Sequence, residues 1–109
     1  MSRVRDFELL VILAILRQPE EPYANRIRED LERNAKRRVT RGAFYRTLDR
    51  LQQKGMIRWE LEPSRVPERG GHPMRRLHVT ATGLAAARRQ QEVLLRFLNA
   101  LEPLTGENE

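Results

Sequence analysis

The sequence lacks cysteine altogether and contains only two histidines, His72 and His78. Without cysteine the chain can form neither disulfides nor thiolate metal sites, and two histidines are too few for a zinc site by themselves. Neither histidine has a partner at the spacing of a catalytic motif. The pair Gly70-Gly71 precedes a predicted strand rather than opening a helix, as a phosphate-binding loop would. We therefore expect a protein that is not an enzyme and that has no metal site and no cofactor.

Long apolar runs are also missing. The apolar stretch at residues 9–16 is far shorter than the roughly 20 residues that a membrane-spanning helix requires. Residues 17–20, which follow it, contain no small-residue cleavage site of the kind that ends a signal peptide. We therefore expect a cytoplasmic protein that does not enter a membrane.

Basic residues outnumber acidic ones. Lysine and arginine together number 21 against 15 aspartates and glutamates, which gives a formal net charge of +6 and a pI near 10.9. Most of the cations are arginines, whose planar guanidinium suits bidentate contacts to phosphate and to guanine. The chain has 109 residues, enough for one domain with a modest core. This balance favours a nucleic-acid partner, with an anionic membrane surface as the alternative.

Residues 40–55 carry the clearest helical pattern. Thr40 can cap the first turn, and Gly55 can end the helix in the left-handed conformation. Phe44, Leu48 and Leu51 form one apolar stripe. The remaining polar or small residues share the outer face and its flanks: Arg41, Gly42, Tyr45, Arg46, Asp49, Arg50 and Gln53. The pattern predicts a DNA-recognition helix, and the alternative is an ordinary solvated face.

Two helices are predicted before this one. Residues 6–18, ended by Pro19, are apolar all the way round at their centre, which indicates burial on more than one side and so a second partner besides the local core. A second helix is predicted to open at residues 21–22, with Pro22 in its first turn. Its inner stripe comprises Tyr23, Ile27 and Leu31, and its charged outer face comprises Arg26, Glu29, Asp30 and Arg33. The cations at residues 36–38 fit either compensation of the helix dipole or phosphate contact. Two helices, a short turn and a third helix form a helix-turn-helix.

After Gly55 the pattern changes to strand-like alternation. Ile57, Trp59 and Leu61 are expected on the inner face of one strand, and Leu77 and Val79 on that of a second strand at residues 75–79. The basic residues of this hairpin are Arg65, Arg69, His72, Arg75 and Arg76. The hairpin is therefore predicted to be a wing that reaches the flanking minor groove or phosphates, the alternative being a mobile basic loop.

A last helix is predicted from a cap at Thr80 to about Leu101. A heptad-like seam runs along it: Leu84, Ala87, Gln91, Leu94, Leu98 and Leu101. Because this helix follows an already complete domain, its apolar face needs a partner, and together with the first helix it predicts a homodimer. The alternative is a monomer in which the two helices cover each other.

Several motifs occur together in order: Leu13-Ala14-Ile15-Leu16; Tyr23 with Ile27; Val39-Thr40-Arg41-Gly42-Ala43-Phe44-Tyr45; Leu48-Asp49-Arg50-Leu51; Lys54-Gly55-Met56-Ile57; Glu68-Arg69-Gly70-Gly71-His72-Pro73; and Leu77-His78-Val79-Thr80-Ala81-Thr82-Gly83. In this order they resemble the PadR family of bacterial transcriptional regulators, over nearly the whole chain. The resemblance implies a dimeric repressor whose third helix enters the major groove, with Tyr45 and Gly42 at the family's tyrosine and glycine positions. Two residues depart from the family pattern: Arg46 follows the tyrosine where many members have proline, and Ala24 occupies a glycine-like site. A single C-terminal helix resembles the short subfamily, whose members can bind apolar or aromatic compounds between subunits.

The expected fold is mainly α with a small β-hairpin, a winged helix-turn-helix plus one C-terminal dimerisation helix. Residues 1–80 form the DNA-binding domain, residues 81–103 the dimerisation helix and residues 104–109 a disordered tail. The expected partners are a double-stranded DNA operator, a second copy of the chain and a small-molecule effector. A winged-helix protein-interaction module without specific DNA binding is the alternative function.

The expected site residues form three sets. DNA contacts are expected from Tyr23, Thr40, Arg41, Gly42, Tyr45, Arg46, Arg50, Arg65, Arg69, Gly70, His72 and Arg75. The dimer interface is expected to contain Phe7, Leu10, Leu13, Leu84, Ala87, Gln91, Leu94, Leu98 and Leu101. An effector pocket would be lined by Trp59, Leu94, Phe97 and Leu98, although Trp59 fits a core position as well.

Overall fold

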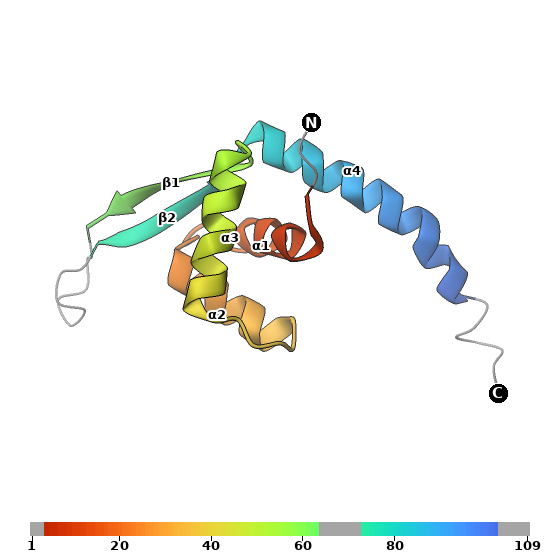
Figure 1. The fold of residues 1–109 in the computed structure, drawn as a ribbon, viewed down its shortest axis with the longest axis horizontal. Helices are drawn as coiled ribbons and strands as arrows, with labels where there is room; N and C mark the ends of the chain where they lie inside the picture. Colours follow the sequence, from red (N-terminus) through yellow and green to blue (C-terminus); the bar gives the residue numbers. More distant parts are fainter. Residues whose placement is uncertain (1–3, 64–72, 103–109) are drawn as a thin grey trace.

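Three helices precede a two-stranded hairpin, and a fourth helix extends away from it (Figure 1). The computed structural model describes residues 4–63 and 73–102. The elements, in chain order, are α1 (Asp6–Leu16), α2 (Ala24–Asn34), α3 (Arg41–Gln53), β1 (Ile57–Glu62), β2 (Met74–Val79), α4 (Ala81–Leu98) and the 3₁₀ turn η2 (Asn99–Leu101). The predicted fold class, mainly helical with a small hairpin, is confirmed.

The limits and the buried face of α3 are those that the sequence predicts. The Thr40 hydroxyl accepts a hydrogen bond from the backbone N–H of Ala43 at 3.2 Å, and Gly55 has a φ of +73°. Phe44, Leu48 and Leu51 are fully buried. These features depend on residues close in sequence, so they can be predicted from local pattern alone.

Helix α2 begins later than predicted. Pro22 was expected in its first turn, but it precedes the N-cap residue, Tyr23. The cause is a tertiary contact: the backbone N–H of Leu77 in β2 donates to the Pro22 carbonyl at 2.9 Å, and Tyr23 forms a bridge with Arg76. This segment is therefore held extended along β2 before the helix starts.

Two charged residues expected on outer faces interact within the protein. Asp30 is buried, and its carboxylate lies 3.6 Å from Arg17 and accepts a hydrogen bond from Asn34. The Arg50 side chain turns back along α3 and donates to the Thr47 hydroxyl at 3.2 Å. The expected outer position is thus wrong for Asp30, whereas the Arg50 side chain remains 43% exposed.

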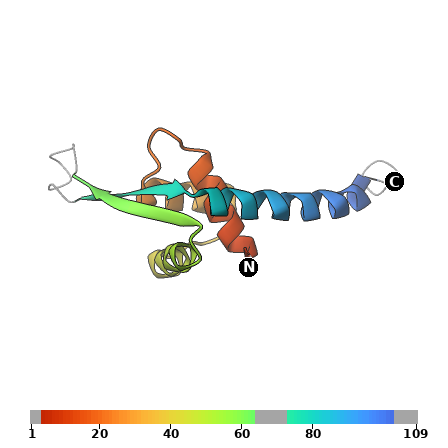
Figure 2. The ribbon, with the colours of Figure 1, turned by 90° about the horizontal axis from the view of Figure 1, so that it is seen from above.

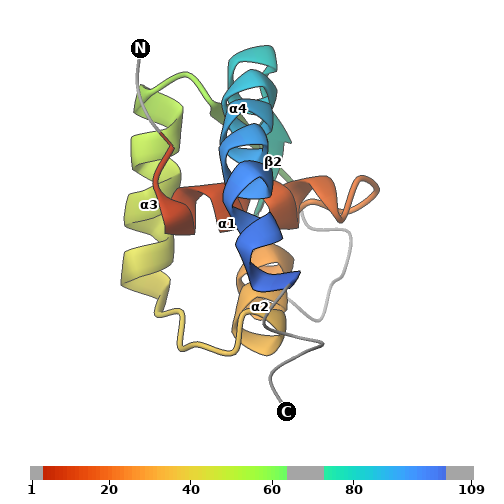
Figure 3. The same cartoon turned by 90° about the vertical axis from the view of Figure 1, so that its right-hand side faces the viewer.

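Helix α1 starts beside α3 and crosses the domain behind α4 in the view of Figure 3. Its inward residues belong to the core: Leu9, Val11, Ile12, Ala14 and Ile15. The opposite side of the same helix carries Leu10, Leu13 and Leu16, which are 36%, 43% and 44% exposed. Within the part of the chain that the structure describes, only one side of this apolar helix is covered.

The hairpin pairs β1 with β2 in antiparallel register, with Ile57 opposite Val79 and Trp59 opposite Leu77. Ile57 and Leu77 are buried, as predicted, whereas Leu61 is 60% exposed. The alternation assigned Leu61 to the correct face of the strand, but the hairpin projects beyond the helices (Figure 2), so none of the described helices covers that face near its outer end.

Helix α4 begins at a close contact with the end of α3. The Thr80 hydroxyl accepts from the Gly83 N–H at 3.1 Å, which is the predicted cap. A Cβ atom on Gly83 would lie 2.1 Å from the Met56 carbonyl oxygen, so only glycine permits this approach. Ala86 and Ala87 are buried, while every residue from Gln91 to Glu102 is exposed. The second half of α4 therefore extends away from the domain (Figure 1).

A buried ion pair joins α1 to the end of α3. Glu8 is 1% exposed, and the Lys54 ammonium donates to its two carboxylate oxygens at 2.8 and 3.1 Å. Burial alone would raise the pKa of Glu8, but the hydrogen bonds from Lys54 and from the backbone N–H of Arg5 outweigh it and lower the pKa below its ordinary value. The ionised form of Glu8 thus stabilises the packing of α1 against α3.

The substitution Lys54→Met should lower the free energy of unfolding by about 3 kcal/mol near neutral pH, because it leaves a buried carboxylate without its main partner. Since the folded-state pKa of Glu8 is lowered, its contribution is complete above the unfolded-state pKa of about 4.3 and is lost as the pH falls through the folded-state value. Urea unfolding at one protein concentration measures both effects.

The matched control is Lys36→Met, which removes the other lysine at an exposed position. It should change the free energy of unfolding by less than about 0.5 kcal/mol. Equal costs for the two substitutions would show that the Glu8–Lys54 pair has no special role in stability.

Candidate nucleic-acid interface

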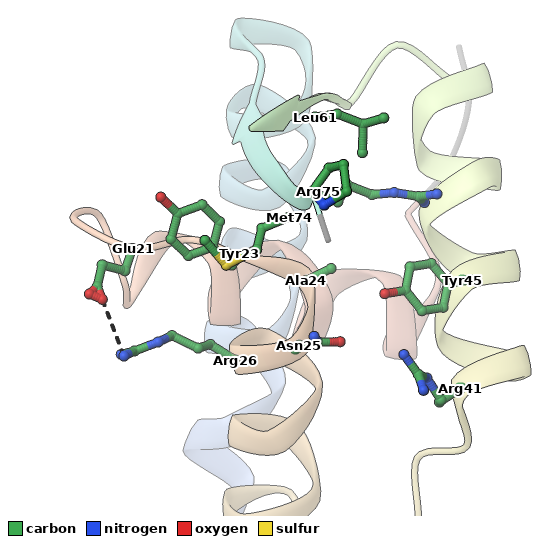
Figure 4. A pocket seen from close by; sticks show the side chains of 11 residues that line it. Glu21, Tyr23, Ala24, Asn25, Arg26, Arg41, Tyr45, Leu61, Met74 and Arg75 are labelled. Carbon is green, nitrogen blue, oxygen red and sulfur yellow. Dashed lines mark ion pairs between the residues drawn. The ribbon is translucent and has the colours of Figure 1, made fainter. Parts of the chain in front are cut away.

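A groove lies between the first turns of α2 and α3 and the hairpin (Figure 4). Its volume is about 540 Å³, and its lining comprises Glu21, Tyr23, Ala24, Asn25, Arg26, Arg41, Tyr45, Leu61, Pro73, Met74 and Arg75. Three guanidinium groups line it, and one of them, that of Arg26, forms an ion pair with Glu21 at 3.2 Å. The groove combines cations with aromatic rings, which are the groups that bind phosphate and bases.

Four of the predicted DNA-contacting residues meet at this groove: Tyr23, Arg41, Tyr45 and Arg75. Arg41 and Tyr45 come from the first half of α3, opposite Asn25 of α2 (Figure 4). Gly42 and Arg46 lie on the exposed side of α3. A Cβ on Gly42 would lie 3.3 Å from an Arg46 guanidinium nitrogen, so the Arg46 side chain lies back over this glycine. The exposed surface of α3 is therefore basic in its first half.

The Tyr23 hydroxyl is engaged within the protein. It donates to a Glu62 carboxylate oxygen at 3.1 Å and accepts from the Arg76 guanidinium at 3.4 Å. Arg76 also lies 3.5 Å from Glu62 and donates to the Glu20 carbonyl at 3.4 Å. The hydroxyl of Tyr23 thus ties the start of α2 to the hairpin. The sequence pattern gave no indication of this cluster, since its members are up to 56 residues apart.

Arg75 lies between two aromatic rings. Its guanidinium carbon is 4.0 Å from the ring centroid of Trp59 and 4.8 Å from that of Tyr45. Tyr45 also packs edge-to-face on buried Phe44, with the ring centroids 5.5 Å apart and an interplanar angle of 76°. Arg75 was predicted only as a DNA contact, and its aromatic neighbours could not be predicted, because the distance between strand and α3 is set by tertiary packing.

The other predicted DNA contacts lie elsewhere. Thr40 caps α3 at its exposed start, and Arg50 lies in the second half of the helix with its Nε 3.5 Å from Glu8. The remaining predicted contacts, Arg65, Arg69, Gly70 and His72, lie outside the described residues.

The predicted dimer residues divide between covered and exposed positions. Ala87 is buried and Leu84 half-buried, whereas Gln91, Leu94, Leu98 and Leu101 are exposed. The remaining predicted members are on α1: Leu10 and Leu13 are exposed, and Phe7 is half-buried against the core with the Arg37 guanidinium 4.9 Å from its ring centroid.

An apolar groove of about 360 Å³ runs between α1 and α4. Leu94 and Leu98, two of the predicted effector residues, line it together with Leu9, Leu13, Leu16, Leu84, Ala87, Arg88, Gln91 and Leu95. The other two do not: Trp59 lies on the hairpin, partly buried against the core, and Phe97 is 74% exposed.

Two further results concern the described part of the chain. Within residues 4–63 and 73–102, no group of three or more histidine, cysteine, aspartate or glutamate side chains is arranged to hold a metal ion. None of the helices described there is both long and apolar enough to cross a bilayer.

Comparisons with solved structures identify the fold. A PadR-like transcription factor from Bacteroides fragilis superposes with a TM-score of 0.70 at 20% identity, covering 91% of this chain and 89% of that one. A PadR family transcription regulator from Clostridium difficile R20291 superposes with a TM-score of 0.71 at 15% identity, covering 92% and 99%. One from Eggerthella lenta DSM 2243 gives 0.65 at 18% identity, covering 90% and 82%. These similarities confirm the winged-helix fold.

The sequence comparison identifies the family. No curated protein matches the chain. Residues 12–89, however, match the transcriptional regulator PadR-like family, and this segment includes α2, α3, both strands of the hairpin, the last turn of α1 and the first half of α4. The resemblance noted in the sequence is thus confirmed: the chain belongs to the PadR-like family of transcriptional regulators.

Proposed function

We propose that the chain is a sequence-specific DNA-binding regulator that acts as a homodimer and represses transcription. The observation that supports this most directly is the state of the arginines on and beside the first half of α3. Among the described residues, neither Arg41 nor Arg46 forms an ion pair, and both lie with Tyr45 in the first two turns of α3. Uncompensated guanidinium groups are available to an anionic partner.

The shape of the domain agrees with entry of α3 into the major groove. The helix lies at one side of the domain (Figure 2), and its first turns carry Arg41, Tyr45 and Arg46. In helix-turn-helix proteins the first residues of the recognition helix reach base edges. The strands of the hairpin flank the protein's groove beside α3. With α3 in the major groove of the DNA, the hairpin would lie against the neighbouring phosphates.

A second copy of the chain is the proposed partner for α1 and α4. Exposed apolar side chains continue from Leu10, Leu13 and Leu16 of α1 to the second half of α4, where they comprise Val93, Leu94, Leu95, Phe97, Leu98 and Leu101. An apolar surface of this extent is typical of an interface rather than of a monomer's surface. In this proposal residues 81–103 form the dimerisation helix.

Two-fold symmetry would then determine the operator. A dimer presents two copies of α3, so we expect a roughly palindromic site with half-sites about one helical turn, or a multiple of it, apart. A small apolar or aromatic effector would bind in the groove between α1 and α4 once a second subunit closes it.

Selection of bound duplexes from a random pool, together with the mass of the protein in solution, tests this proposal. A palindromic consensus and a dimer are expected. Binding to all duplexes with equal affinity would indicate a nonspecific DNA-binding protein. A dimer that binds no duplex in a mobility-shift assay would favour the protein-interaction module.

The substitution Arg46→Ala should relax specificity at one base pair of each half-site, with a loss of about 1–3 kcal/mol in discrimination there. The reason is that a bidentate guanidinium contact is lost from an exposed position on α3. Competition between the consensus duplex and single-base variants measures it. Arg33→Ala, at an exposed position of α2 away from the groove, is the matched control and should leave every position unchanged. If Arg46→Ala weakens all duplexes equally, Arg46 contacts phosphate instead of a base.

The substitution Leu98→Asp should convert the dimer to a monomer, because it introduces a charge into the proposed interface. Affinity for the full operator should fall roughly a hundredfold, since two linked recognition helices become independent. Analytical ultracentrifugation and operator titration measure the two effects. Ala85→Asp, an exposed position on the polar side of α4, should alter neither. A dimeric Leu98→Asp variant would exclude this face of α4 from the interface.

A further inference from the structure

Arg75 lies on the face of the hairpin that is turned toward α3. In the hairpin Arg75 is opposite Leu61, and Trp59 is opposite Leu77, so Arg75 and Trp59 are diagonal neighbours on the same face. This face points toward α3, where the Tyr45 ring also lies against the guanidinium, with its centroid 4.8 Å from the guanidinium carbon. Arg75 therefore fills the space between the hairpin and the recognition helix.

The adjacent arginine shows what is unusual about this arrangement. Arg76 lies 3.5 Å from the carboxylate of Glu62, which compensates its charge. Arg75 forms no ion pair with any residue of 4–63 and 73–102, and its neighbours are the rings of Trp59 and Tyr45. The N–H donors of a guanidinium lie in its plane, so a group stacked by its faces keeps its edge free for hydrogen bonds. That edge lies at the groove that Arg41 also lines.

Both rings are themselves fixed. Tyr45 packs against Phe44, which is fully buried, and Trp59 packs against the same core. The guanidinium of Arg75 therefore connects β2 to α3 through contacts to two rings that the core supports. A flexible ammonium would not maintain this connection, because lysine has no planar group to stack.

We infer that Arg75 is a positioning residue that sets the spacing between the hairpin and α3, and that this spacing determines how well the protein distinguishes DNA sequences. The edge of the Arg75 guanidinium would also bind one DNA phosphate at the groove that Arg41 lines. This inference rests on the proposed DNA-binding function. The positive charge of Arg75 alone would not set the spacing between the hairpin and α3.

The substitutions Arg75→Lys and Arg75→Met distinguish the spacing role of Arg75 from its contact with a phosphate. The probes are a consensus duplex selected by the wild-type protein and a scrambled duplex of equal length, each titrated over a range of salt concentrations. Arg75→Lys should preserve the salt slope, because the charge remains, but lower the ratio of the two affinities roughly two- to thirtyfold, as expected for loss of the stacking. Arg75→Met should lower the ratio similarly and also reduce the slope by about one unit.

Arg58 provides the matched control, since it is exposed on the opposite face of the same hairpin. Arg58→Lys should leave the affinity ratio unchanged. Trp59→Phe, which keeps a ring against Arg75, should retain more of the ratio than Trp59→Leu. An Arg75→Lys variant with the wild-type ratio would overturn the inference, as would equal ratios for the two Trp59 variants.

A measurement without DNA separates this inference from the proposed function. In the free protein the side-chain protons of Arg75 should be shifted upfield in NMR spectra by the two rings, and Trp59→Leu should reduce that shift. If the shift is present but no duplex is preferred, the proposed function fails while the stacked arrangement stands. If the protein selects an operator but Arg75 shows no ring-current shift, the positioning role is wrong.

Discussion

The burial of α1 is the constraint on which the rest of the structure depends. One side of this helix is covered by the core, and at its first turn Glu8 forms a buried ion pair with Lys54 at the end of α3. Its other side leaves Leu10, Leu13 and Leu16 exposed. The core of a chain of this size is small, and among the described residues it leaves this second side exposed. The same helix thus supports α3 through one side and leaves an apolar surface on the other.

The distribution of charge is as informative as its total. Several arginines are compensated locally: Arg17 by Asp30, Arg28 by Glu32 and Arg76 by Glu62. Arg41, Arg46 and Arg75 have no carboxylate partner among residues 4–63 and 73–102, and all three lie at or beside the groove between α3 and the hairpin. A net charge of +6 is a weak argument for DNA binding, since it says nothing about location. The position of these three arginines beside the rings of Tyr45 and Trp59 is a stronger argument than the total charge, because it locates the cations at one surface.

The sequence predicted what depends on near neighbours and missed what depends on distant ones. The caps at Thr40 and Thr80 and the buried stripe of α3 were predicted because their partners lie within a turn or two. The inward turn of Asp30, the extended segment before α2 and the Glu8–Lys54 pair could not be, since their cause is contact between separate elements. Leu61 illustrates a further limit: alternation gives the face on which a residue lies, but how far that face is covered depends on where the helices end.

The two strands of the hairpin explain why consecutive arginines have different surroundings. A two-stranded hairpin is marginally stable by itself, so it must be supported from the domain. Successive residues of a strand point to opposite faces. Arg75 accordingly stacks toward α3, with Trp59 as its diagonal neighbour, while Arg76 reaches the start of α2, with Glu62 as its own. The hairpin is thus attached on one face by aromatic stacking and on the other by a charged network. Because α2 and α3 share one core, the two attachments together fix the hairpin relative to α3.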